Sequence, residues 1–507
     1  YEGLWEEGHY VEALAALEGF MEEETILHDK WLIQRSQLRF IVGRVEEAIE
    51  DMETMTLRSP QPRFYLELAL MHRYRGDEEL YAQWLTGAIK SIQNQRWVNM
   101  STNENVAAVG RIYELAGENP KSILGSFYDP FLEQAQFKVS EAAYVGAGDL
   151  AYRRGGYDVA EGYYLKALEL NEHHQAALAG LVECYWKSND ARLGATMERL
   201  LSINASHPRA HRVMIHRALE MRETDEAHTL IEKMLAINPK HTQVLGYLAA
   251  THFLEDDTTG SEAAVQKALK VNPKASSVYR ILGEVASRHY RFSEGVAFQE
   301  KALGLNEEDH RARELYALDL LRLGREEEAR RELDRVFKAN PYSVLSYNLL
   351  EMMDTLAAFA TVTREEVVLK MPHSEEAVMA DAMVDLLEVA IVHFEEKYRV
   401  GLTKPILVEL FEEHDDFMVR SVGLPGNAGH LGICFGRLIT MDAPSVRPRG
   451  SSNWRSVLWH EFVHVVTLQK TNNRMPRWLS EGISVYEEGV YAPAFHNRFD
   501  RAFIPIL

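Results

Sequence analysis

The 507-residue sequence predicts a mainly α-helical protein, in which a long array of helical repeats precedes a smaller α+β domain. Two observations lead to this prediction. A short phrase ending in Asn recurs every 33 or 34 residues along the middle of the chain, and after Pro341 the pattern changes to alternating strands and helices. The net charge of −21 makes nucleic acid or an anionic membrane a poor partner, because their negative charges repel the chain. No apolar run is long enough to predict a transmembrane segment.

The repeats are marked by their ends, which fall at Asn171, Asn204, Asn238, Asn272, Asn306 and Asn340. A polar or small turn lies about fifteen residues before each Asn, so each unit is predicted as helix, turn, helix and stop. Small and aromatic residues such as Gly148 and Tyr164 recur at a spacing that lets two helices pack closely. Residues 142–340 thereby resemble the tetratricopeptide repeat family, and the resemblance implies a concave groove for a peptide or protein partner.

Looser copies of the repeat come first, with Gly8, Gly43 and Gly76 at expected turns, and residues 95–140 around Trp97 break the period. We therefore expect degenerate repeats over 1–140, regular repeats with a capping helix (344–358) over 141–362, and an α+β domain over 363–507. The chain begins with Tyr rather than Met and stops in an apolar run, so we expect sequence to be missing at both ends.

The last domain is predicted to alternate strands and helices. The expected strands are 367–371, 405–411 and 432–441, and the expected helices are 376–398, 415–422, 453–469 and 476–488.

One of these helices carries metal-binding chemistry. His460 and His464 are four residues apart, so both imidazoles lie on one helix face and can bind one metal ion. Glu461 lies beside them, placed to accept a proton from water at the metal. Glu481, in an otherwise apolar helix and followed by Gly482, is the expected third ligand. Three protein ligands leave one position open, as in catalytic zinc sites.

Residues 365–490 resemble the gluzincin zinc metallopeptidases, and within them the peptidase MA-like domains, through His460–His464 and the stretch from Trp478 to Gly482. The resemblance implies Zn²⁺ bound by His460, His464 and Glu481, with Glu461 as general base and later proton donor. It also implies an edge strand that binds the substrate peptide, here Gly432, Ile433, Cys434, Phe435 and Gly436. This strand has no carboxylate before Asp442, which favours an endopeptidase over an aminopeptidase.

Three further roles stay open. The group that stabilises the oxyanion is sought among Tyr486, Tyr491 and His496, and His430 is another candidate for a substrate or oxyanion contact. Glu488 either hydrogen-bonds a ligand histidine or faces solvent.

The predicted function is zinc-dependent hydrolysis of peptide bonds, with the repeats recruiting a protein substrate or partner. The alternative is a non-enzymatic scaffold of tetratricopeptide repeats that carries an inactive metallopeptidase-like domain. Glu461 favours the enzyme, because a degenerate peptidase has no metal-binding reason to keep it. The sequence does not determine the compartment, although such a fusion favours the bacterial cell envelope or secretion over the cytoplasm.

Overall fold

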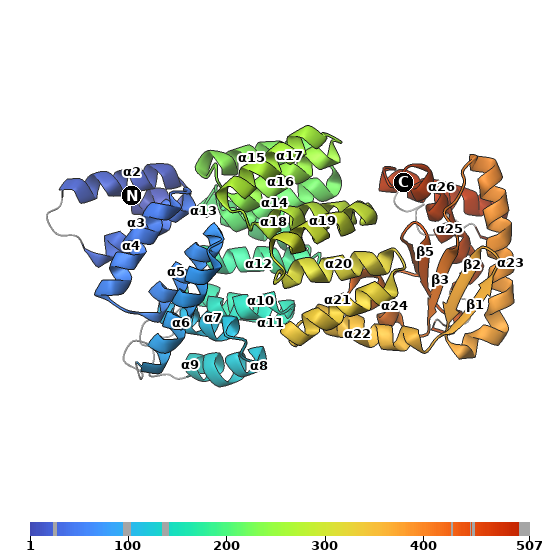
Figure 1. The fold of residues 1–507 in the computed structure, drawn as a ribbon, viewed down its shortest axis with the longest axis horizontal. Helices are drawn as coiled ribbons and strands as arrows, with labels where there is room; N and C mark the ends of the chain where they lie inside the picture. Colours follow the sequence, from blue (N-terminus) through green and yellow to red (C-terminus); the bar gives the residue numbers. More distant parts are fainter. Residues whose placement is uncertain are drawn as a thin grey trace. The chain divides into compact units, whose positions relative to one another are not determined.

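The computed structural model describes residues 1–23, 28–94, 103–133, 141–426, 429–446, 448 and 452–495. The chain divides into two compact units, residues 1–282 and 283–507 (Figure 1). None of the described helices is long and apolar enough to cross a membrane. Trp97 and His496 lie outside the described residues.

The first unit is built from helices that pair along the chain, which confirms the predicted helix-turn-helix repeats. They are α1 (Glu2–Glu6), α2 (Tyr10–Glu23), α3 (Asp29–Ile41), α4 (Val45–Arg58), α5 (Pro62–Arg75), α6 (Glu78–Asn94), α7 (Asn103–Leu115), α8 (Pro120–Ser122), a π-helical turn (Ile123–Tyr128), α9 (Asp129–Glu133), α10 (Glu141–Arg153), α11 (Tyr157–Leu170), α12 (Gln175–Lys187), α13 (Leu193–Ile203), α14 (Pro208–Met221), α15 (Thr224–Ile237), α16 (Thr242–Leu254), α17 (Thr258–Val271) and α18 (Ser276–Arg288), the last of which crosses the boundary.

The recurring Asn has a local structural reason. At Asn171, Asn204, Asn238, Asn272 and Asn306 the side-chain oxygen accepts the backbone N–H two residues later, for example from Ser206 to Asn204 (3.1 Å) and from Lys240 to Asn238 (3.0 Å). This short ring forms a tight turn and stops the helix.

The same Asn residues also contact the first repeats. A Cβ atom added at Gly8 or Gly43 would lie 2.3 Å from the side-chain oxygen of Asn204 or Asn238 respectively. The amide of Asn204 also donates to the Tyr10 hydroxyl (2.9 Å). Repeats far apart in the sequence therefore pack against each other within the first unit, at positions where only glycine leaves room.

The second unit begins with the last repeats and ends with the α+β domain. Its elements are α19 (Phe292–Leu305), α20 (His310–Arg322), α21 (Glu326–Ala339), α22 (Val344–Ala357), β1 (Ala360–Arg364), β2 (Val367–Met371), α23 (His373–Tyr398), β3 (Ile406–Phe411), α24 (His414–Val422), β4 (Gly432–Cys434), β5 (Leu438–Asp442), a 3-10 turn (Pro444–Val446), α25 (Trp454–Lys470) and α26 (Arg477–Tyr491).

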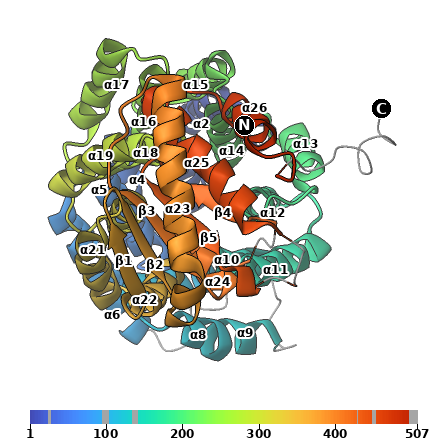
Figure 2. The ribbon, with the colours of Figure 1, turned by 90° about the vertical axis from the view of Figure 1, so that its right-hand side faces the viewer.

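Five strands form one mixed sheet in the order β1-β2-β3-β5-β4. The strand pairs β2/β3 and β3/β5 are parallel, whereas both edge strands, β1 and β4, run antiparallel to their neighbours. Alternate side chains of β3 enter different hydrophobic clusters: Val408 and Leu410 pack with α23 and α25, and Phe411 packs with α20, α21, α22 and α24. Figure 2 shows α23 lying across the sheet.

Two details of the sheet differ from the prediction. The single strand expected over 432–441 is a hairpin, because Gly436 adopts φ +95° and Phe435 donates its N–H to the carbonyl of Leu438 (2.7 Å). Strand β1 was not predicted, since Ala360 is its only buried residue and an edge strand with exposed side chains lacks a hydrophobic pattern.

The repeats and the sheet share one core within the second unit. Arg420 donates to the carbonyl of Leu321 (2.8 Å), and Arg437 donates to the carbonyl of Leu323 (3.1 Å). Phe417 is fully buried in the cluster that α20–α22 complete. The compact unit that contains the sheet therefore also includes the last repeats, from residue 283.

Candidate metal centre

The two histidines and Glu481 come together between helices α25 and α26. The Nε2 atoms of His460 and His464 are 3.1 Å apart, and the Oε2 atom of Glu481 lies 3.3 Å from the first and 3.5 Å from the second. Zinc with ligands at about 2.0–2.1 Å in a tetrahedron requires ligand atoms about 3.3 Å apart. The triangle therefore has the size that a zinc ion requires, and its donors are of the type that zinc prefers.

The outer nitrogens of both imidazoles are held in place. Nδ1 of His460 lies 2.5 Å from Oε1 of Glu488, whose other oxygen accepts a hydrogen bond from Ser456 (2.9 Å). Nδ1 of His464 lies 2.8 Å from the hydroxyl oxygen of Ser480. These contacts orient the rings so that both Nε2 atoms face Glu481.

The carboxylate of Glu461 is buried beside edge strand β4. A Cβ atom added at Gly432 would lie 2.7 Å from Cγ and 3.1 Å from Oε1 of Glu461, so the glycine makes room for this side chain. Burial raises the pKa of Glu461, and the charges of Glu481 and Glu488 add to the rise while His464 and His460 oppose it.

The charges at the centre favour a cation. Burial lowers the pKa of His460, but hydrogen bonds with Glu481 and Glu488 outweigh this effect and raise the pKa to about 10. Hydrogen bonds with His460 and His464 hold the pKa of Glu481 well below its usual range. Three carboxylates around two imidazoles make a site in which a proton or a metal ion is strongly favoured.

The expected substrate strand is shorter than predicted. Gly432, Ile433 and Cys434 form β4, which among the described residues pairs only with β5. Phe435 and Gly436 lie in the hairpin turn, and Phe435 is buried against Phe292 and Leu438 rather than presented to a peptide. Cys434 is also buried.

The candidates for oxyanion stabilisation are not brought together. Tyr486 is 63% exposed, and its ring centroid lies 5.9 Å from the ammonium of Lys397. Tyr491 stacks on Trp459 with ring centroids 3.7 Å apart, as part of the packing between helices. His430 is half-buried two residues before β4.

Tyr290 is a residue of this region that the sequence analysis missed. It lies in the turn between α18 and α19 and packs against the hydrophobic cluster that contains α25. Burial raises its pKa, and the charges of Glu461 and Glu481 add to the rise while Arg477 opposes it. Its φ of +60° lies in the left-handed region, as at the corresponding turns. Gly155, Asn189, Asp256 and Gly324 are of types that tolerate this conformation, whereas Arg222 and Tyr290 are bulky. The signal in the sequence that could have pointed to Tyr290 was an aromatic residue at this turn position.

Comparison with known proteins identifies repeats only. Residues 145–194 match the family model of the tetratricopeptide repeat. A solved tetratricopeptide repeat protein from Parabacteroides merdae ATCC 43184 is 16% identical with a TM-score of 0.35, covering 51% of this chain and 98% of that chain. The human IFIT1 dimer with m7Gppp-AAAA is 12% identical with a TM-score of 0.35, covering 66% of this chain and 79% of that chain. No curated protein matches the sequence.

Proposed function

We propose that this chain is a zinc-dependent endopeptidase whose repeats recruit a protein substrate or partner. The proposal rests on one observation: His460, His464 and Glu481 form a triangle of zinc dimensions, beside a buried Glu461 at the edge of a sheet. The match to tetratricopeptide repeats supports a protein partner, and by itself it favours the non-catalytic scaffold over the peptidase.

Each residue has a defined task in the proposed reaction. His460, His464 and Glu481 would hold the ion, which when bound supplies Lewis acidity toward water and a peptide carbonyl. Glu461 accepts the proton of the attacking water and passes it to the departing amine. Glu488 keeps His460 in the orientation that presents Nε2 to the centre. The edge of β4 that pairs with no other strand among the described residues would bind an extended peptide by main-chain hydrogen bonds.

The experiment compares the zinc-loaded chain with Glu461→Gln on a library of fluorogenic peptides. We expect the substitution to lower hydrolysis by about 10²–10⁴-fold, because it removes the base, while the zinc content stays unchanged. Glu396→Gln, on an exposed position of α23, is the matched control and should keep full activity. Equal hydrolysis by the unaltered chain and Glu461→Gln would rule out the mechanism. A zinc-loaded chain without hydrolysis on any peptide would favour the scaffold.

A further inference from the structure

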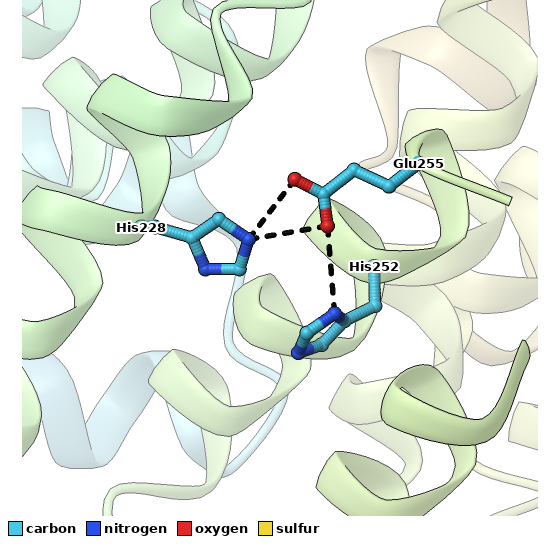
Figure 3. A group of neighbouring side chains, drawn as sticks. All are labelled: His228, His252 and Glu255. Carbon is cyan, nitrogen blue, oxygen red and sulfur yellow. Dashed lines mark hydrogen bonds and ion pairs between the residues drawn. The ribbon is translucent and has the colours of Figure 1, made fainter. Parts of the chain in front are cut away.

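A second group of metal-binding side chains lies in the repeats, far along the sequence from His460. His228 belongs to α15, His252 to the last turn of α16, and Glu255 directly follows α16. Figure 3 shows both imidazole rings turned toward the Glu255 carboxylate. Nε2 of His228 lies 3.1 Å from one carboxylate oxygen, and Nδ1 of His252 lies 3.5 Å from the other. The three ligand atoms lie within 4.8 Å of one another.

Asp257 lies beside this group, close to His252. Its Oδ1 atom accepts the N–H of Gly260 (2.9 Å) and caps α17, whereas its Oδ2 atom lies 3.1 Å from Nδ1 of His252. That nitrogen is shielded from solvent, yet among the described residues it has no partner in hydrogen-bond geometry. A ring nitrogen close to two carboxylates without a well-formed hydrogen bond is arranged as a metal ligand is.

His252 and Gly260 differ from the residues at the same positions of the other repeats. One repeat away, the position of His252 is filled by the buried small residues Ala218 and Ala286, and two repeats away by the buried Cys184 and Leu320. The position of Gly260 is filled by Glu226 and Glu294 in the neighbouring units.

The histidine at position 252 and the glycine at position 260 depend on each other for space. A Cβ atom added at Gly260 would lie 2.8 Å from Nδ1 of His252 and 2.2 Å from Oδ2 of Asp257. The glycine therefore leaves the space that the imidazole and the carboxylate occupy, which a residue with a Cβ would disturb.

Charge also favours a cation at this place. Glu255 and Asp257 carry two negative charges, and the carbonyl end of α16 adds partial negative charge. Arg222, which donates to the carbonyl of Leu254 (3.2 Å), offsets only part of this charge.

We propose that His228, His252 and Glu255 form a second divalent-metal site, of the zinc type, that joins α15 to the end of α16. Two imidazoles and one carboxylate are a donor set that zinc accepts, with water in the fourth position of the tetrahedron. The ion links two consecutive helices, so its effect is to stabilise the repeats. This site is independent of the proposed peptidase.

The test uses the full chain with His460→Ala, which removes a ligand of the first centre. Zinc is added, excess ion is removed by gel filtration, and metal per chain is measured by elemental analysis and by calorimetric titration. We expect one zinc ion to remain. Adding His252→Ala should weaken its binding by about 100-fold or more, and Gly260→Ala, which keeps every ligand, by about 10-fold. His173→Ala, an exposed histidine beside Glu172, is the matched control and should change nothing.

Loss of folding does not obscure the result, because His252→Ala restores the small residue of neighbouring repeats. Zinc should raise the melting temperature of the His460→Ala chain and leave that of His460→Ala/His252→Ala unchanged. The Co²⁺ derivative should show the visible absorption of a tetrahedral ion only when His252 is present. A His460→Ala chain that binds no zinc would overturn the proposal, and so would equal binding with and without His252.

Discussion

At the scale of single residues, Glu481 and Glu488 of α26 contact the two different ring nitrogens of His460. The Oε2 atom of Glu481 faces Nε2 at 3.3 Å, and the Oε1 atom of Glu488 faces Nδ1 at 2.5 Å. The two glutamates are seven residues apart, so both project from one face of the helix. Glu481 is therefore the proposed ligand, and Glu488 is the group that orients the imidazole ring of His460.

Replacing Glu488 should weaken zinc binding without removing a ligand. We expect Glu488→Ala to lower zinc affinity by about 10–100-fold, and Glu488→Gln to have a smaller effect because its amide oxygen still accepts from His460. Competition with a fluorescent chelator measures both. Glu396→Gln serves as the control on an exposed surface. Unchanged affinity of Glu488→Ala would show that the contact with Nδ1 is irrelevant to the metal.

Glu67 of α5 should make stability depend on pH. Burial raises its pKa to about 7, although Arg63 and a hydrogen bond from Gln37 oppose the rise. The folded state therefore binds the proton more tightly than the unfolded chain, whose glutamate titrates near 4.3. The free energy of unfolding should fall by about 1–3 kcal/mol as the pH rises from about 4.5 to about 7.

Glu67→Gln should abolish this part of the pH dependence and be more stable than the unaltered chain at pH 8. Urea unfolding at several pH values measures the difference, with the exposed Glu50→Gln as control. If Glu67→Gln and the unaltered chain changed in parallel with pH, the carboxyl of Glu67 would not be the titrating group.

At the scale of elements, the turns between paired helices determine which residues the repeats tolerate. Gly43 and Gly155 both adopt positive φ, +85° and +82°. Their surroundings differ, because an added Cβ would meet Asn238 at 2.3 Å in the first case and nothing within 4 Å in the second. Both turns favour glycine because of their backbone conformation. Only at Gly43 would a side chain also clash with a distant repeat.

Gly43→Ala should therefore destabilise the chain more than Gly155→Ala. We expect about 1 kcal/mol at Gly155 from the left-handed backbone alone, and about 2–4 kcal/mol at Gly43 from the added clash. Thermal or urea unfolding compares them. Equal losses would mean that the contact between Gly43 and Asn238 does not form in solution.

At the scale of the whole molecule, the last repeats and the sheet fold as one body. Phe411 and Phe417 are fully buried between the sheet and α20–α22. Exposing such side chains costs about 1.5–3 kcal/mol each, which is large beside a typical domain stability of about 5–15 kcal/mol.

Truncation should reveal this dependence. We expect residues 273–507 to unfold cooperatively and residues 363–507 to be unfolded or aggregated, because the shorter fragment exposes the face of Phe411. Circular dichroism and calorimetry distinguish the two. A cooperatively folded 363–507 would show that the repeats are dispensable for the sheet. The comparison also shows how many of the repeats can be deleted without unfolding the sheet, which an experiment on substrate recruitment by the repeats requires.

The sequence by itself determined what depends on local periodicity. Recurring Asn residues predict the helix pairs because an Asx turn forms within a few residues, and a spacing of four predicts that His460 and His464 share a face. Contacts within one helix or turn depend little on the rest of the chain, so a single sequence contains enough information for them. The distance from His464 to Glu481 was a weaker signal, because it crosses a loop.

Only the tertiary structure decided which distant groups meet. It places Glu488 against His460, brings Tyr290 from a repeat turn to the core around α25, and gathers His228 with His252. Each of these contacts depends on how separate helices pack, and packing is set by many side chains acting together. No spacing along the chain encodes such a meeting, which is why the second proposed metal site became apparent only once the helices were folded.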